Sequence, residues 1–202
     1  MAEYKSTPLF GGALIADLPA TFADVRSFYA STIRQVPDNQ EVYIDKDGFT
    51  SIIFDIIERV GGPGTGPEID GNALTIHLEE LVADDIEHVK VWNSTPTQFS
   101  RLDDDIPAYT LIATHTPKAD PANPASNKTD FTALLMTLVR LEREKTDILI
   151  TINVPHIRGE YDEVEVDLQL GKQGKLIGDA VDHASKIWET FKVKDWGLFN
   201  EV

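Results

Sequence analysis

Two long β-forming segments, residues 131–141 and 148–154, constrain the fold more than any other feature of this chain. Both are rich in β-branched and other apolar residues, a composition that favours strands. Between them lies a short charged stretch that contains Glu142, Arg143 and Glu144. Strands joined by so short a connection pair antiparallel, so we expect a β-hairpin here.

The other expected elements are shorter and alternate in type. Apolar patterning and turn residues predict strands over 8–19, 41–45, 88–92 and 109–116, and helices over 21–33, 73–83 and 176–191. The last helix presents one apolar stripe, formed by Ile177, Val181, Ala184, Ile187, Trp188 and Phe191. The glycine-rich segment 61–72 and the segment 118–128 are expected to be loops.

Residues 51–60, SIIFDIIERV, are ambiguous between a helix and a strand. Five apolar residues fall at helical spacing, and Gly61 would suit the end of a helix. Four isoleucines and one phenylalanine in the same segment favour a strand, which is the assignment we prefer.

This order of elements predicts one α+β domain. Strands dominate the middle of the chain and the helices occur singly, so we expect an antiparallel β-sheet flanked by helices on its faces, an α/β/α sandwich. The length of 202 residues suits one domain, and neither an internal repeat nor a linker divides residues 1–202.

The charge balance limits the partners of the chain. With 34 acidic residues against 18 Lys and Arg, the formal net charge is -16, which repels nucleic acid and anionic lipid and suits a basic protein partner. Cysteine is absent, which excludes disulfides and thiolate sites. We find no signal peptide and no apolar segment near the roughly 18–20 residues of a membrane span, so a nucleocytoplasmic location is expected.

No catalytic, metal or cofactor site is predicted. The five histidines have neither HxH nor HExxH spacing, and the sequence GGPGTG at 61–66 lacks the Lys-Ser/Thr of a phosphate-binding loop. The sequence DKDG at 45–48 has its glycine too early for a calcium loop and is interpreted as a hairpin turn. Carboxylates are abundant, yet nothing in the sequence distinguishes an acid-base pair.

An unbroken polar row, formed by Pro37, Asp38, Asn39, Gln40 and Glu41, stands between apolar segments. In one interpretation it is a β-turn in which proline fixes φ and the polar side chains accept local hydrogen bonds. The row is longer than a turn requires, however. The functional interpretation is a rigid, exposed acidic segment that meets a protein partner.

The polar row belongs to one of three sequence blocks that resemble a known protein family. PLFGGA at 8–13, RQVPDNQEV at 34–42 and SIIFDIIE at 51–58 resemble, in order and spacing, the Mog family of Ran guanine-nucleotide release factors. The resemblance extends to TDILITINVP at 146–155 and to DWGLFNEV at the end of the chain, and it is weak between 61 and 130. It implies an antiparallel sheet flanked by helices, an architecture shared with PsbP proteins, and a Ran-binding regulator of nuclear transport rather than an enzyme.

The resemblance also assigns surface residues to Ran binding. Those carried over from the family are Asp24, Arg34 and Glu41 around the second block, and Asp55 and Glu58 in the third. We add two neighbours in the polar row, Asp38 and Gln40. If 51–60 is a strand, Asp55 and Glu58 point to opposite faces, whereas a helix would place them on one face. Arg34 could pair with Ran or brace Glu41 internally.

Linkage then suggests how such a surface acts. A partner that binds nucleotide-free Ran more tightly than loaded Ran weakens nucleotide binding by the same factor, without covalent chemistry. We expect the acidic side chains to engage basic or switch residues that support the phosphates. The sequence leaves open whether a Ran-binding cofactor protein joins the complex. The alternatives are an acidic module for another basic partner and a small-molecule enzyme with a polar pocket.

The segment 156–175 carries a second concentration of acidic residues: Glu160, Asp162, Glu163, Glu165 and Asp167. A solvated loop is one interpretation, because charge runs are usually solvated. A second contact with a basic partner is another. The alternation of Val164, Val166, Leu168 and Leu170 with charged residues also allows an extra edge strand.

Overall fold

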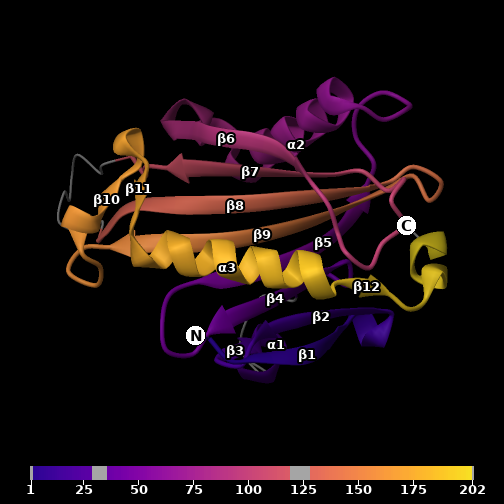
Figure 1. Ribbon diagram of the computed structural model, residues 1–202, viewed down its shortest axis with the longest axis horizontal. Coiled ribbons are helices and arrows are strands. Elements are labelled where there is room, and N and C mark those ends of the chain that lie inside the picture. Colours follow the sequence, from indigo (N-terminus) through magenta and orange to yellow (C-terminus); the bar gives the residue numbers. More distant parts are fainter. Residues whose placement is uncertain (1, 29–35, 119–127, 202) are drawn as a thin grey trace.

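The computed structural model describes residues 2–28, 36–118 and 128–201, and Figure 1 shows how their elements are arranged. The main strands are β1 (Tyr4–Leu9), β2 (Leu14–Pro19), β3 (Phe22–Asp24), β4 (Gln40–Asp45), β5 (Ser51–Glu58), β6 (Val89–Thr97), β7 (Ala108–His115), β8 (Thr129–Leu141) and β9 (Thr146–Ile157). Three strands are two residues long: β10 (Val166–Asp167), β11 (Lys172–Gln173) and β12 (Lys192–Val193). The helices are α1 (Val25–Phe28), α2 (Pro67–Val82) and α3 (Gly174–Thr190), with short 3-10 turns between elements.

A seven-stranded antiparallel sheet forms the centre of the molecule, in the order β3-β4-β5-β9-β8-β7-β6. Strands β1, β2 and β12 form a separate three-stranded sheet, and β10 pairs only with β11. The long strands β8 and β9 lie in the middle of the large sheet, as Figure 1 shows. No helix in the described ranges is long and apolar enough to cross a membrane.

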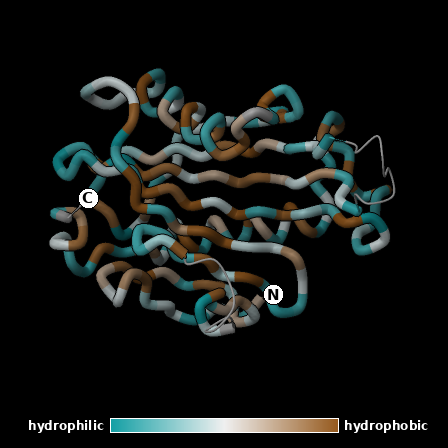
Figure 2. Tube along the Cα trace, turned by 180° about the vertical axis from the view of Figure 1, so that it is seen from behind, coloured by the Kyte–Doolittle hydropathy of each residue, from teal (hydrophilic) through white to brown (hydrophobic). Residues whose placement is uncertain are grey.

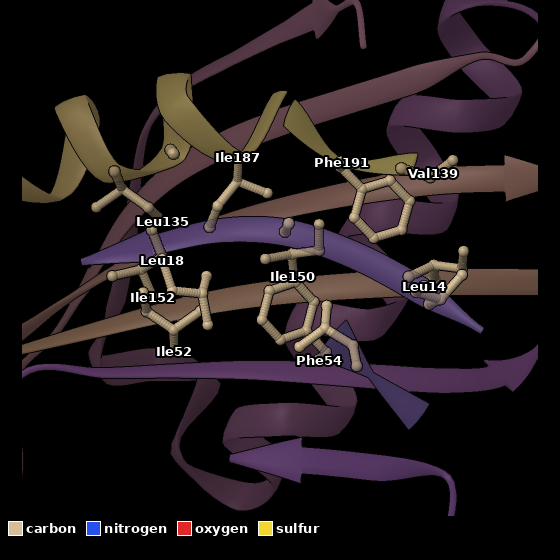
Figure 3. Packing of buried hydrophobic residues seen from close by; sticks show 14 of the residues in the cluster. Leu14, Leu18, Ile52, Phe54, Leu135, Val139, Ile150, Ile152, Ile187 and Phe191 are labelled. Carbon is tan, nitrogen blue, oxygen red and sulfur yellow. The ribbon is translucent and has the colours of Figure 1, made fainter. Parts of the chain in front are cut away.

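Both faces of the central sheet are covered. On one face, α3 and the β1–β2 hairpin pack over residues such as Phe54, Val139 and Ile150, and Figure 3 shows Ile187 and Phe191 of α3 and its C-cap directed into this core. On the opposite face, α2 packs over β7 and β8. Hydrophobic residues therefore follow the central strands in Figure 2, while hydrophilic residues gather in the connections.

Several expectations from the sequence are confirmed. The α+β class is confirmed, and so are the β8–β9 hairpin, the strands β4 and β7, and the final helix. Residues 51–58 form a strand whose alternate side chains Ile52, Phe54 and Ile56 are buried. Branched side chains fit this half-buried pleated surface better than a helix, which explains why their composition outweighed the helical spacing.

Four expectations about elements were wrong in extent. Residues 8–19 are not one strand, because a turn with positive φ at Phe10, Gly11 and Gly12 separates β1 from β2. In the predicted helix 21–33, residues 22–24 form β3 and α1 begins at Val25; residues 29–35 lie outside the described ranges. Helix α2 begins at Pro67 instead of residue 73, since proline suits the first turn.

The fourth expectation that was wrong in extent is the extra edge strand suggested for residues 156–175. Val166 and Asp167 pair only with Lys172 and Gln173, and 3-10 turns flank β10, so this segment does not extend the large sheet. Apolar and charged residues alternate in this segment, but the segment does not form a long edge strand.

A buried charge cluster fixes α2 and the glycine-rich loop to the sheet. Arg140 is 1 % exposed, and its Nε lies 3.2 Å from Asp147 Oδ1 and 3.6 Å from Asp70 Oδ1. The same guanidinium donates to the Val60 carbonyl at 2.7 Å. On α2, His77 Nε2 lies 3.0 Å from Asp147 Oδ2. These contacts hold the glycine-rich loop at both of its ends.

We predict that Arg140→Met lowers the free energy of unfolding by about 3–5 kcal/mol, because it leaves two buried carboxylates without a cation. Urea denaturation measures the change. The matched control is Arg143→Met in the adjacent turn, where the arginine side chain is 87 % exposed and the cost should stay within about 0.5 kcal/mol. Equal stability of both variants would show that the cluster does not stabilise the fold.

Candidate partner-binding surface

The polar row begins with a β-turn that Arg26 holds in place. Gln40 N donates to the Pro37 carbonyl at 3.1 Å, which closes the turn. The guanidinium of Arg26, on α1, donates to the carbonyl of Pro37 at 3.2 Å and to that of Gln40 at 2.8 Å. Asp38 and Asn39 are exposed at its tip. The expectation of a rigid, exposed segment therefore holds for Asp38 and Asn39.

Asp24 supports the element that carries Arg26. Its Oδ1 accepts a hydrogen bond of 2.8 Å from Arg26 N, and its carbonyl accepts one of 2.6 Å from Ser27 Oγ. A carboxylate at this place satisfies an amide of the first helical turn, so it fixes where α1 begins. Asp24 is partly exposed and lies at the end of β3, opposite Tyr43 in the ladder.

The expectation that Glu41 is exposed was wrong. Glu41 is 7 % exposed, and its Oε1 accepts a hydrogen bond of 2.8 Å from Phe10 N. Its Oε2 accepts one of 3.1 Å from the Tyr43 hydroxyl, and burial together with the neighbouring Glu41 carboxylate raises the pKa of Tyr43. Phe10 has φ of 48°, a left-handed conformation that costs energy for a bulky residue. Glu41 therefore stabilises a strained turn rather than presenting a free charge.

Gln40 and Asp55 form a second polar pair on the opposite face of the sheet. They lie opposite each other in the β4–β5 ladder, and Gln40 Nε2 donates to Asp55 Oδ1 at 2.7 Å. Burial raises the pKa of Asp55, while the hydrogen bond from Gln40 and the charge of His77 act in the other direction. Asn39 extends the ladder, since its carbonyl accepts from Ile56 N at 2.8 Å.

The predicted site residues are thus divided between two faces and one end of the sheet. Glu58 is exposed at the end of β5, on the face opposite Asp55, as the strand alternative predicted. Asp38 is exposed in the turn near the same end of the β4–β5 ladder. Arg34 lies outside the described residues, so neither of its two suggested roles is tested.

The three sequence blocks nevertheless converge. Glu41 of the second block binds Phe10 of the first, and Gln40 and Asn39 bind Asp55 and Ile56 of the third. Distant segments of the chain are therefore joined by hydrogen bonds to β4, on both faces of the sheet. The available chemistry of these groups is hydrogen-bond acceptance and negative charge. Among the residues described, no three acidic or histidine side chains converge on a point that could hold a metal ion.

Arg26, which is not among the residues predicted from the sequence, holds the turn and lies 3.8 Å from Glu41. A signal was present: Arg26 and Arg34 are the only basic residues between Lys5 and Lys46. In a stretch so poor in cations, an arginine next to a capping aspartate is a natural partner for the carbonyl groups of a nearby turn.

Comparisons with known proteins identify the family of this chain. Residues 7–155 match the family described as Ran-interacting Mog1 protein. A Dictyostelium discoideum protein named "Probable ran guanine nucleotide release factor" is 32% identical over 202 residues, which cover 97% of this chain and 96% of that protein. The "Nuclear import protein mog1" of Schizosaccharomyces pombe is 28% identical over 73% of this chain and 75% of its own.

A solved structure has the same fold. The crystal structure of the Saccharomyces cerevisiae Ran-binding protein Mog1p matches with a TM-score of 0.67 and 24% identity, covering 98% of this chain and 100% of that chain. The seven-stranded sheet with helices on both faces is therefore an architecture already known in a solved protein.

We predict that Glu41→Ala lowers the free energy of unfolding by about 2–3 kcal/mol, because it leaves two donors without their charged acceptor. Glu41→Gln should cost about half as much, since its amide oxygen can still accept from Phe10 N and its NH2 group can donate to the Tyr43 hydroxyl oxygen, so only the charge is lost. Chemical denaturation measures both. Glu58→Ala is the exposed control, and a comparable loss there would argue against a bracing role for Glu41.

Asp55→Asn should have the opposite effect. The raised pKa of Asp55 means that the folded protein binds more protons than the unfolded chain between the ordinary aspartate value of about 3.9 and the higher folded value. Stability is therefore lost as pH rises through this window. Asparagine keeps the acceptor for Gln40 without the charge, so the variant should be more stable at pH 7.

The stability difference between Asp55→Asn and the parent chain should disappear below about pH 4, where both carry a neutral side chain. Thermal unfolding from pH 3 to pH 8 measures it. Asp38→Asn, at an exposed position, is the matched control. A stability difference for Asp55→Asn that is the same at every pH would show that the charge is not its cause.

Proposed function

Because the chain belongs to the Ran-interacting Mog1 family, we propose that it binds the small GTPase Ran and promotes release of its guanine nucleotide, in support of nuclear protein import. Curated relatives carry the names Ran guanine nucleotide release factor and nuclear import protein. Residues 1–202 would act as one Ran-binding domain, in the nucleus and the cytoplasm.

One observation above others supports a contact surface around β4. The three sequence blocks of the family resemblance are joined there by direct hydrogen bonds, although they are separate in the chain. A purely structural role would not require the exposed side chains at the end of this ladder. We therefore assign the contact to this end of the β4–β5 ladder, with Asp24, Asp38, Gln40, Asp55 and Glu58 distributed over its two faces and the adjoining turn. Glu41 and Arg26 act as positioning residues.

Asp55 is the residue in this set that is most suited to bind a cationic side chain of the partner. It is partly buried, its pKa is raised by burial, and a hydrogen bond from Gln40 orients it. A desolvated carboxylate gains more than an exposed one from an incoming cation, because less water has to be displaced. Residues with perturbed pKa values in such positions are enriched at functional sites.

The proposed action is noncatalytic. Small GTPases hold the phosphates of their nucleotide with a lysine and a magnesium ion. Carboxylates that engage the lysine or the switch segments stabilise the nucleotide-free state, and linkage requires that nucleotide affinity falls by the same factor. The protein forms and breaks no covalent bond in this scheme and needs no cofactor. Its formal charge of -16 favours rapid encounter with a basic surface.

The test is release of a fluorescent guanine nucleotide from purified Ran at low and at physiological salt. We expect the parent chain to accelerate release, and the double variant Asp38→Lys/Glu58→Lys to reduce the stimulated rate at least about tenfold, which corresponds to about 1.4 kcal/mol. Both positions are exposed, so the fold should persist. Asp55→Asn should also lose activity while gaining stability.

The matched control is Glu3→Lys/Glu79→Lys, which changes charge equally at two exposed positions outside the assigned surface. It should retain release within about twofold at physiological salt, where distant charges are screened. Equal losses in both double variants would mean that net charge, rather than this surface, carries the effect. No binding of Ran by the parent chain would refute the function itself.

A further inference from the structure

A small cavity lies between the end of β9, the acidic segment 160–166 and the beginning of α3, away from the surface around β4. Its volume is about 230 Å³, and it is lined by His156, Glu160, Tyr161, Asp162, Glu165, Val166, Lys175 and Leu176. One water occupies roughly 30 Å³ of liquid, and drug-sized ligands need roughly 300–1,000 Å³. This space is therefore the right size for a single side chain.

His156 lines this cavity and carries a buried hydrogen-bond acceptor without a partner in the described residues. The residue is 0 % exposed, and its Nδ1 lies 3.0 Å from the Val154 carbonyl. A carbonyl only accepts, so Nδ1 carries the proton, and burial lowers the pKa of His156 and keeps the ring neutral. Its Nε2 then bears a lone pair, and this buried atom has no hydrogen-bond partner in the described residues.

Aromatic rings hold the imidazole in place. The ring of Phe131 stacks on it at 4.0 Å between centroids, and the ring of Tyr161 meets it edge-on at 4.8 Å. The Tyr161 hydroxyl donates to Asp130 Oδ2 at 3.1 Å, and Arg158 Nε donates to Asp130 Oδ1 at 3.1 Å. Burial raises the pKa of Tyr161 to about 12, so its ring remains a neutral phenol.

The rim of the cavity carries unneutralised negative charge. Glu160, Asp162 and Glu165 line it, and the residues that the structure describes provide no ion pair within 4.0 Å to any of them. The nearby cations are already engaged, since Lys175 pairs with Asp179 and Arg158 with Asp130. An occupant must therefore be a cation that also donates hydrogen bonds.

We propose that this cavity receives an arginine side chain from a basic segment of a protein partner. A guanidinium carries five N–H donors in a fixed plane, which can serve the imidazole Nε2 and the rim carboxylates together. It is also weakly hydrated and stacks on aromatic rings, so it enters an aromatic-walled space more readily than an ammonium group does. A metal ion is disfavoured, because no ligand set converges within the described ranges.

Two neighbouring side chains favour a polypeptide over a free small cation. Val164, in the segment that forms the rim, is 83% exposed, and Leu170, a few residues further along the chain, is 73% exposed. These are the largest exposed fractions among the exposed large hydrophobic residues in the described part of the chain. Apolar residues beside a charged pocket supply the contact area that a bound segment needs. This site is independent of the surface proposed to bind Ran.

The experiment uses the full chain labelled with ¹⁵N and two matched probes, N-acetyl-arginine methylamide and N-acetyl-citrulline methylamide, which share a shape and differ in charge. Titration followed by NMR should give saturable shifts at the amides of residues 156–166 and at His156 Nε2 with the arginine probe. The citrulline probe should shift them at least about tenfold less at equal concentration, because it lacks the charge.

The variant Glu160→Gln/Glu165→Gln removes two of the three rim charges, both at exposed positions, and it should weaken binding of the arginine probe at least about tenfold. The variant Glu3→Gln/Glu79→Gln makes the same change elsewhere and should bind like the parent chain. Shifts that spread over all acidic surfaces, that occur equally with citrulline, or that survive in the first variant would each overturn the proposal. The readout involves no Ran, so its failure leaves the proposed function untouched.

Discussion

The central strand pair β8 and β9 has both faces buried, and the rest of the structure follows from this constraint. Residues 133–141 and 146–152 are buried without interruption, so neither face of this pair can be left to water. Helix α2 covers one face, while α3 and the β1–β2 hairpin cover the other. Each cover has to be attached to the sheet by specific contacts, because hydrophobic packing alone does not fix orientation.

Buried charged groups provide those attachments. Arg140 projects from the α2 face of the sheet and joins Asp70 of the helix to Asp147 of β9, which also contacts His77. On the opposite face, Glu41 reaches from β4 to the strained turn at Phe10 and so fixes the β1–β2 hairpin. Carboxylates of this kind are indistinguishable in sequence from surface charges, and yet Asp70, Asp147 and Glu41 form internal contacts that hold the covering elements to the sheet.

The attachment of the hairpin also builds the candidate surface. Once Glu41 is anchored inside, its neighbours in the polar row are forced outward, with Asp38 and Asn39 at the tip and Gln40 directed to Asp55. Arg26 fixes the turn by binding its carbonyl groups. The negative charge of the chain therefore reaches a partner at defined positions, and the acidic segment after β9 forms a second, separate site for a cation.

The sequence alone determined the β8–β9 hairpin, the strand at 51–58, the final helix and the α+β class, because local composition and periodicity carry that information. Family resemblance also identified the three blocks that meet around β4. Only the tertiary structure decided that Glu41 is buried, that Gln40 pairs with Asp55, and that Arg26 holds the turn. The physical reason is that burial and pairing of a polar side chain depend on groups distant in the chain. The partner of Glu41 is the backbone amide of Phe10, and the partner of His156 is the ring of Phe131 in β8. A local sequence pattern reveals neither contact.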